Sequence, residues 1–331
     1  MRPNRPTIAS LLLIGLASFA QQPGNAPYQD LTLTPERRAA DLVSRMTLEE
    51  KVLQKQNSGP VPKRKAMLAK MPPYLLEPDG TLKEWAWPTL QEHYTHRHVS
   101  PLYGPWPDGA WPADEIDPDR TPQLARAAEI AGRRRTVDAL ATAVAGETLP
   151  AYGRCHRALV GARLKDNVIV DVQRRQLMEQ GYVSTALRCS REPYGPPVPD
   201  ALGGIPTIIM EMLAYSRPGV MEVLPALPSK LVKGSIHGML ARTFARIDRL
   251  ARDMDARTVD LTVTSVRKQD VTLIARYGIE AITAPAGVLA AALRVGKADI
   301  DVHLPENRPV TFHLKLGHHQ PLDWVNQVSV A

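Results

Sequence analysis

Apolar residues recur every three to four positions through the first part of the chain, which is the spacing of one buried helix face. Two helix starts carry capping signals, because Thr121 precedes Pro122 and Thr47 opens the capping box Thr47-Leu48-Glu49-Glu50. Gly181 lies where a left-handed residue commonly follows a helix. The pattern predicts helices over residues 35–46, from residue 47 onward, and over residues 122–130, 155–164 and 172–180.

After Pro228 the pattern changes to strict alternation of apolar and polar residues, the spacing of a strand that buries one face. Turn residues lie between the alternating segments, so the strands are expected to pair antiparallel. These segments are residues 259–266, 271–277 and 310–316. The sequence therefore predicts a helical domain over residues 56–228, a small antiparallel β domain over residues 229–318 and a tail over residues 319–331.

The candidate chemistry centres on Asp200, which lies between the proline-rich residues 196–199 and Gly203-Gly204. Proline fixes φ and glycine permits conformations that other residues avoid, so we expect Asp200 in a rigid, tightly turning loop. The apolar run of residues 207–216 predicts a buried helix that begins at Pro206. The local sequence leaves two roles open for Asp200, a site carboxylate or a residue that only caps the turn.

Composition and charge narrow the class of protein. Hydrophobic residues make up 44% of the 331 residues, which is enough for packed cores and excludes a disordered chain. The formal net charge is +7, but the basic residues are scattered, and Arg133-Arg134-Arg135 is the only basic triplet. No aromatic residues are interleaved with basic runs, so the charge indicates a solvated surface and no nucleic-acid site.

The N-terminus has the pattern of a secretory signal. Two arginines precede the apolar run of residues 8–19, and small residues lie at the two positions that a signal peptidase recognises. The run is shorter than the roughly 20 residues that span a bilayer. We therefore expect a signal peptide over residues 1–20, a linker with short helices over residues 21–55, and a secreted or periplasmic mature protein outside the membrane. Export permits a disulfide between Cys155 and Cys189, but two buried thiols are favoured.

A polar cluster surrounds Arg97, which lies among three histidines ending at His98. The histidine spacing does not match a helical pair of metal ligands with a third ligand nearby, so no metal is expected. Arginine supplies a planar fork of donors and histidine a donor or an acceptor, which suits the hydroxyls of a sugar ring. Glu84 and two tryptophans precede the cluster. An exposed indole can stack on a sugar face, although tryptophan is as often part of a core.

Ordered motifs along the chain resemble one known family. They are Lys83-Glu84-Trp85, residues 96–103, residues 156–166, Asp200 to Pro206, residues 211–220, residues 224–228 and Gly234 to Gly238. With these motifs, residues 66–318 resemble the C-terminal part of glycoside hydrolase family 95, the α-L-fucosidase and α-L-galactosidase group. The resemblance implies a partial (α/α)₆ barrel followed by a β-sandwich, in agreement with the predicted order of helices and strands.

The resemblance also implies a mechanism and a site. In that family an inverting reaction uses a glutamic acid as general acid, and asparagines with an aspartate activate a water molecule. Asp200 matches the aspartate, Arg97 and His98 match a pair that holds the fucose-like ring, and Glu84 lies in a motif near that site. The substrate would be an oligosaccharide or a polysaccharide, and no cofactor is needed because a carboxylic acid can protonate the leaving oxygen.

The chain departs from the family in having no counterpart of the general acid or of the water-holding asparagines. We therefore expect a truncated or chimeric member, with Glu84, Glu92 and Glu147 as local candidates for the acid. Residues 28–54 resemble the opening of family 3 glycoside hydrolases, the β-glucosidase group. Two alternatives to a fucosidase thus remain, a non-catalytic carbohydrate-binding or structural remnant and a β-glucosidase-like fragment.

Overall fold

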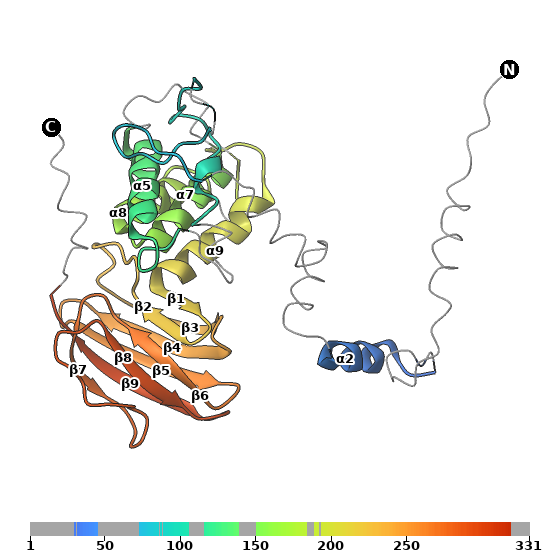
Figure 1. Ribbon diagram of the computed structural model, residues 1–331, viewed down its shortest axis with the longest axis vertical. Coiled ribbons are helices and arrows are strands. Elements are labelled where there is room, and N and C mark those ends of the chain that lie inside the picture. Colours follow the sequence, from blue (N-terminus) through green and yellow to red (C-terminus); the bar gives the residue numbers. More distant parts are fainter. Residues whose placement is uncertain are drawn as a thin grey trace. The chain divides into compact units, whose positions relative to one another are not determined.

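The computed structural model of the chain describes residues 30, 32–45, 73–85, 87, 89–105, 116–138, 150–183, 189–191 and 193–318. The chain forms two compact units, Met1–Pro73 and Tyr74–Ala331. In the first unit the described helix is α2 (Pro35–Arg45), which confirms the helix predicted over residues 35–46 (Figure 1). The predicted signal peptide and the helix predicted from residue 47 lie outside the described residues.

The second unit contains helices that overlap the predicted segments, although the last of them starts and ends earlier than predicted. They are α5 (Pro122–Arg133), continued by a π-helical turn (Arg134–Asp138), then α7 (Ala151–Leu164), α8 (Asn167–Glu179) and α9 (Pro199–Leu213), with a short 3₁₀ helix at Ser100–Leu102. Helix α8 begins earlier than predicted because the Asp166 carboxylate accepts hydrogen bonds from the backbone N–H groups of Val168 and Ile169. It ends before Gly181, whose φ of +80° confirms the predicted left-handed position.

Helix α9 corrects the expected loop around Asp200. The helix begins at Pro199 and not at Pro206, so Asp200 lies in its first turn and Gly203-Gly204 lies inside it. Gly204 serves helix packing, because a Cβ at this position would lie 2.7 Å from the sulfur of Cys155 on α7. The N-cap position of this helix is Val198. Both cysteines are buried thiols that form no disulfide, as the sequence favoured.

Replacing Gly204 by alanine is expected to destabilise the chain by about 1–2 kcal/mol, because the added methyl group overpacks the contact with Cys155. Gly203 provides a matched control, since a Cβ there meets nothing within 4 Å. Alanine at Gly203 should stabilise the helix by roughly 0.5–1 kcal/mol, because glycine loses more backbone entropy on folding. Urea unfolding of both variants measures the two effects, and equal signs would contradict the packing role of Gly204.

The β part consists of two sheets that follow the helices. The four-stranded sheet has the order β1 (Ala214–Arg217), β2 (Val220–Val223), β6 (Gln269–Ile274) and β8 (Asp299–Leu304). The five-stranded sheet has the order β3 (Lys233–Ala241), β4 (Ala245–Asp253), β5 (Thr258–Ser265), β9 (Pro309–Leu316) and β7 (Ile279–Thr283). All neighbouring strands pair antiparallel except β2 and β6, which are parallel.

The predicted order of helices before mostly antiparallel strands is thus confirmed, and β5, β6 and β9 match the three alternating segments. Strand structure begins at Ala214, directly after α9, so β1 and β2 precede the predicted boundary at Pro228. One hydrophobic cluster includes Ile208 of α9, Leu273 of β6 and Leu261 of β5, among others. Because this cluster is continuous, α7, α8, α9 and both sheets share one core, whereas α5 packs in a second cluster with Val160 and Leu164 of α7.

Buried Glu222 on β2 also joins the helical and β parts. Its carboxylate forms ion pairs with Lys165, which follows α7, at 3.0 Å and with Arg276, which follows β6, at 2.6 Å. Arg276 in turn pairs with Asp119, before α5, at 2.8 Å. Two cations on one buried carboxylate, each from a different part of the chain, fix the sheets against the turn after α7.

Candidate functional site

The first turn of α7 lies against the segment that carries Arg97 and His98. A Cβ at Gly153 would collide with the carbonyl oxygen of Arg97, so only glycine lets the two backbones approach this closely. The ring of His98 lies 5.4 Å from that of Tyr152, centroid to centroid. One turn further along α7, buried Arg157 donates a hydrogen bond of 2.8 Å to the carbonyl of His96. The helix therefore positions both residues expected to hold a sugar ring.

Aromatic rings continue from this contact in a row. His96 lies 5.2 Å from His98 and 5.9 Å from His93 between ring centroids, and the rings are tilted. Such rings present flat faces to a ligand and polar nitrogens at their edges. Across the described part of the chain, no group of three or more His, Cys, Asp and Glu residues is placed to hold a metal ion. The histidine cluster is therefore best interpreted as a polar and aromatic surface.

Glu84 lies in a buried ion-pair network that is joined to this row at His93. Arg135, whose side chain is fully buried, donates to Glu84 at 2.9 Å, to Glu92 at 3.3 Å and to the carbonyl of His93 at 3.1 Å. A carboxylate oxygen of Glu92 also accepts the backbone N–H of Glu84 at 2.7 Å. One guanidinium thus holds two carboxylates and the start of the histidine segment. We name Glu84, Glu92 and Arg135 the Arg135 network.

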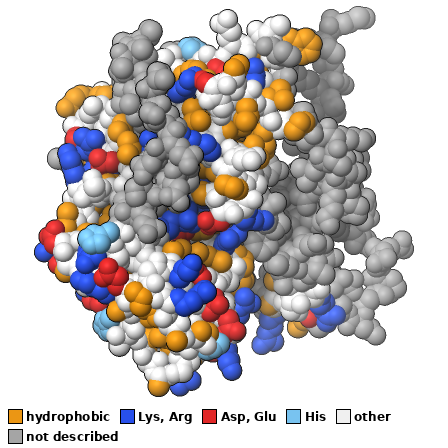
Figure 2. Space-filling view, turned by 60° about the vertical axis from the view of Figure 1, so that its left-hand side comes forward, with side chains coloured by type: hydrophobic (Ala, Val, Ile, Leu, Met, Phe, Trp, Pro, Cys, Tyr) orange, Lys and Arg blue, Asp and Glu red, His pale blue; other side chains and the backbone are white. Residues whose placement is uncertain are grey.

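The basic triplet is therefore not the solvated surface that the sequence indicated. Successive helical residues point about 100° apart, so each of these arginines meets a different partner. Arg133 forms ion pairs with Glu129 at 2.9 Å and with Asp166 at 2.6 Å. Arg134 pairs with Asp79, and Arg135 holds its own network. Elsewhere on the described surface, basic and acidic side chains are interspersed on the face drawn in Figure 2.

Backbone hydrogen bonds bring the start of α9 to the same end of the helical part. The N–H of Ala151, the first residue of α7, donates to the carbonyl of Arg191 at 2.7 Å. The N–H of Arg191 donates to Pro196 at 2.8 Å, and the N–H of Val198 to Cys189 at 3.0 Å. Residue 200 follows two positions later, in the first turn of α9. The backbone positions of 97, 98 and 200 are thus connected to the region around the N-termini of α7 and α9, and Glu84 is linked to the same segment only through Arg135 and the carbonyl of His93.

A polar cavity of about 490 Å³ opens beside the Arg135 network. Its walls include Asp79, Lys83, Gln91, Glu92, Tyr94 and Arg134. The neighbouring tryptophans, Trp85 and Trp87, are 45% and 67% exposed, so neither is part of a core. Charged donors, amide and carboxylate acceptors and aromatic faces together match the surface of a polyhydroxylated ring.

Of the three candidate acids, Glu84 and Glu92 are both ion-paired to Arg135, and Glu147 lies outside the described residues. The sequence did not single out Glu129, a fully buried glutamate on α5. Burial raises its pKa to about 7, although Arg133 and Arg126 oppose the rise. Its neighbour Asp166 follows the C-terminus of α7, about 20 Å along the helix from Tyr152. Glu129 therefore bears on stability and not on the candidate site.

Glu129 should make the chain more stable in mild acid. An unfolded glutamate has a pKa of 4.5, so between about pH 4.5 and pH 7 the folded chain retains a proton that the unfolded chain has released. The free energy of unfolding should then fall by about 2–3 kcal/mol as pH rises through this window, and no further above it. Urea unfolding at pH 5 and pH 8 measures the slope. Glu129→Gln should reduce it, and an unchanged slope in that variant would refute the assignment.

The chain is similar in sequence to known proteins. The family model described as the glycosyl hydrolase family 95 catalytic domain matches residues 30–213, which end with the last residue of α9. The match includes residues 84, 97, 98 and 200, and nearly all of the stretch that resembles family 3. Alpha-L-fucosidase 2 of Arabidopsis thaliana is 30% identical over 216 residues, which are 61% of this chain and 23% of that protein. The aligned part thus spans about a quarter of the relative's length.

Two solved structures show weaker similarity. A GH127 β-arabinofuranosidase has 14% identity and a TM-score of 0.26 over 50% of this chain and 31% of its own. A GH127 β-L-arabinofuranosidase from Geobacillus stearothermophilus T6 has 12% identity and a TM-score of 0.24 over 58% of this chain and 31% of its own. These scores are too low to support an argument about the fold.

Proposed function

The chain belongs to glycoside hydrolase family 95, and on this premise we propose that it is an inverting glycosidase that releases terminal α-L-fucosyl or α-L-galactosyl groups from oligosaccharides or polysaccharides. The observation that carries the proposal is the connection of Arg97, His98 and the first turn of α9, which contains Asp200, to one end of α7. The similarity to a plant protein called alpha-L-fucosidase 2 supports the choice of sugar.

In the proposed mechanism, Asp200 acts on the base side of the sugar. An inverting glycosidase places a base and an acid on opposite faces of the ring, roughly 6.5–9.5 Å apart, so that a water molecule fits between the base and the anomeric carbon. Asp200 acts on this water either as the base that takes its proton or by orienting an amide that holds the water in place. The water oxygen bonds to the anomeric carbon as the glycosidic bond breaks, and the leaving oxygen receives a proton from the general acid.

Arg97 and His98 bind the ring hydroxyls in this proposal. Their segment is held by the hydrogen bond from Arg157 to the carbonyl of His96 and by the ring contact between His98 and Tyr152. Glu84 contributes through the Arg135 network, which fixes the start of the same segment. Both carboxylates are held in ion pairs by buried Arg135, so we assign the proton-donating role to neither Glu84 nor Glu92.

The proposal also includes the architecture of the helical part and the location of the mature chain. We propose that α5, α7, α8 and α9 are part of an (α/α)₆ barrel. These four helices precede the sheets, and α7 contributes residues to both hydrophobic clusters, so it packs against the helices of each. We also propose that the mature chain acts outside the cytoplasm, on the strength of the signal-like residues 1–20. Within the described residues, no helix has both the length and the apolar composition needed to cross a membrane.

The second candidate function is carbohydrate binding without hydrolysis. It is favoured by one observation, namely that both glutamates of the Arg135 network are engaged in ion pairs beside the polar cavity. The β-glucosidase alternative has no such support, because the family 95 match already includes nearly all of the stretch that suggested it.

The deciding experiment incubates the purified chain with 2′-fucosyllactose and follows the anomer of the released sugar by proton NMR. Early appearance of β-L-fucose supports the inverting glycosidase. Binding of fucose without release, from a chain shown by circular dichroism to be folded, supports the binding function instead. Absence of both would refute the site. A parallel assay with a β-glucoside tests the third alternative, for which we expect no release.

A further inference from the structure

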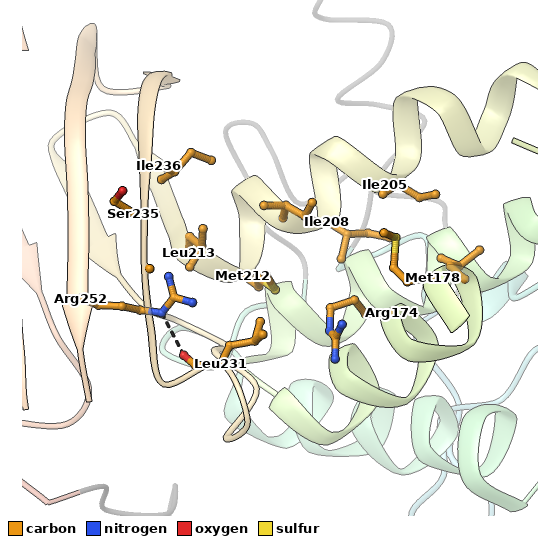
Figure 3. A pocket seen from close by; sticks show the side chains of 13 residues that line it. Arg174, Met178, Ile205, Ile208, Met212, Leu213, Leu231, Ser235, Ile236 and Arg252 are labelled. Atoms are coloured by element: carbon orange, nitrogen blue, oxygen red, sulfur yellow. Dashed lines mark hydrogen bonds between the residues drawn. The ribbon is translucent and has the colours of Figure 1, made fainter. Parts of the chain in front are cut away.

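A second cavity, of about 310 Å³, lies between the helices and the five-stranded sheet (Figure 3). Its apolar wall comes from α8, α9, β3 and the preceding loop, and includes Met178, Ile205, Ile208, Met212, Leu231 and Ile236. It follows the later turns of α9, so Met212 lies about 18 Å along the helix from residue 200. On α9 the lining begins at Ile205, and it includes none of residues 84, 97, 98 and 200, so the cavity shares no residue with the candidate glycosidase site.

The lining of this cavity does not suit a sugar ring. Hydrocarbon and thioether side chains cannot satisfy the hydroxyl groups of a buried carbohydrate, and each unpaired hydroxyl would weaken binding. The volume is at the lower end of the roughly 300–1,000 Å³ that is typical of small-molecule sites. An apolar molecule of modest size is the ligand that this wall would accept.

Two guanidinium groups give the cavity a positive charge. Figure 3 shows Arg252 extending from the sheet and Arg174 from α8. Arg252 donates its Nε–H to the carbonyl of Leu231 at 3.0 Å, and no carboxylate of the described residues forms an ion pair with it. Burial lowers the pKa of Arg252, as expected for a cation without an acidic neighbour. A half-buried cation in an apolar wall is stabilised when an anion binds beside it.

The positive charge of Arg174 is only partly neutralised by its acidic neighbour. Arg174 pairs with Asp171 at 2.8 Å, but Asp171 also pairs with Arg175 at 3.0 Å, so two cations share one carboxylate. The buried Nε of Arg174 has no hydrogen-bond partner among the described residues. At the other side of the cavity, Gly234 leaves the guanidinium of Arg252 uncovered, since a Cβ at that position would lie 3.1 Å from its nearest nitrogen.

We propose that this cavity binds a monocarboxylate with an apolar body, such as a medium-chain fatty acid. The carboxylate pairs with Arg252, whose planar fork can donate two parallel hydrogen bonds to two oxygens. The apolar body packs on Ile208, Met212 and Ile236. Arg174 provides a second positive group on the opposite wall. The proposal is independent of the glycosidase function, because it uses neither the Arg97 segment nor the first turn of α9.

Isothermal titration of the full chain with octanoate, 1-octanol and octyltrimethylammonium tests the proposal. We expect one equivalent of octanoate to bind, octanol to bind about ten-fold more weakly because it lacks the charge-assisted pair, and the ammonium compound not to bind. Arg252→Gln should weaken octanoate binding by about ten-fold or more and leave octanol binding unchanged. Equal affinities of wild type for octanoate and octanol would overturn the proposal.

Two further variants keep the result interpretable if Arg252→Gln does not fold. Met178 is 45% exposed at the cavity edge. Met178→Trp should therefore block the cavity from its edge without overpacking the core, and should abolish binding of octanoate and of octanol. Arg249→Gln, on the same strand but outside the cavity lining, should bind octanoate as wild type does. Octanoate binding that survives Met178→Trp, or that is absent because sedimentation shows a second copy of the chain covering this face, would also overturn the proposal.

Discussion

Replacing Asp200 by asparagine is expected to reduce hydrolysis of 2′-fucosyllactose by about three orders of magnitude, because a positioned general base contributes roughly 10²–10⁴ to the rate. Asparagine has the same shape but cannot accept the proton of the attacking water. The position belongs to the first turn of α9, and an acid there gains only about 0.3–1 kcal/mol from the helix dipole. Folding should therefore be nearly unaffected. Initial rates by proton NMR and the thermal midpoint by circular dichroism measure the two quantities.

A surface carboxylate provides the matched control for Asp200. The side chain of Asp255 is 69% exposed and, among the described residues, forms its ion pair with Lys233, so Asp255→Asn should leave both the rate and the thermal midpoint unchanged. If Asp200→Asn retained activity within a factor of about three of wild type, Asp200 would have no part in the proton transfer. A fall in activity that is matched by unfolding would assign the residue a structural role and would contradict the mechanism equally.

The predictable parts of the fold are those in which local pattern and burial agree. Strands β5 and β9 were predicted because their residues alternate between buried and partly exposed, as a half-buried strand requires. Strand β3, at an edge of its sheet, buries one residue in nine and leaves no alternation to find. The predicted start of α9 was wrong because Gly203-Gly204 and Pro206 usually interrupt helices. The close approach to Cys155 overrode this local preference.

The candidate site divides in the same way. Arg97 and His98 were selected because they belong to one short segment that matches a family motif. In the structure this segment packs against the first turn of α7. Arg135 was missed because its partner Glu84 is 51 residues away in sequence, and spacing alone contains no information about such a contact. A usable signal existed in the sequence. Three consecutive arginines that follow an apolar helical pattern span about 200° of the helix circumference, so one of them is expected near the buried face, where it needs an acidic partner.

Replacing Arg135 by methionine is expected to destabilise the chain by about 3–5 kcal/mol, the effect of removing one partner from a buried ion pair. Two carboxylates would lose their counter-ion, because the side chains of Glu84 and Glu92 are only 9% and 3% exposed. Arg135→Lys should not rescue stability fully, since one ammonium group cannot reproduce the fork that reaches both glutamates and the carbonyl of His93. Urea unfolding at pH 7 measures the loss.

An exposed pair and a cycle of variants separate this network from ordinary surface charge. The side chain of Arg246 is 57% exposed and pairs with Asp248, so Arg246→Gln should lower the free energy of unfolding by less than about 1 kcal/mol. Adding Glu84→Gln and Glu92→Gln to Arg135→Met should recover much of the loss, because neutral amides need no counter-ion. A loss at Arg135 no larger than that at Arg246 would contradict the network. Because Arg135 also holds the start of the histidine segment, Arg135→Met should weaken sugar binding even where the chain remains folded.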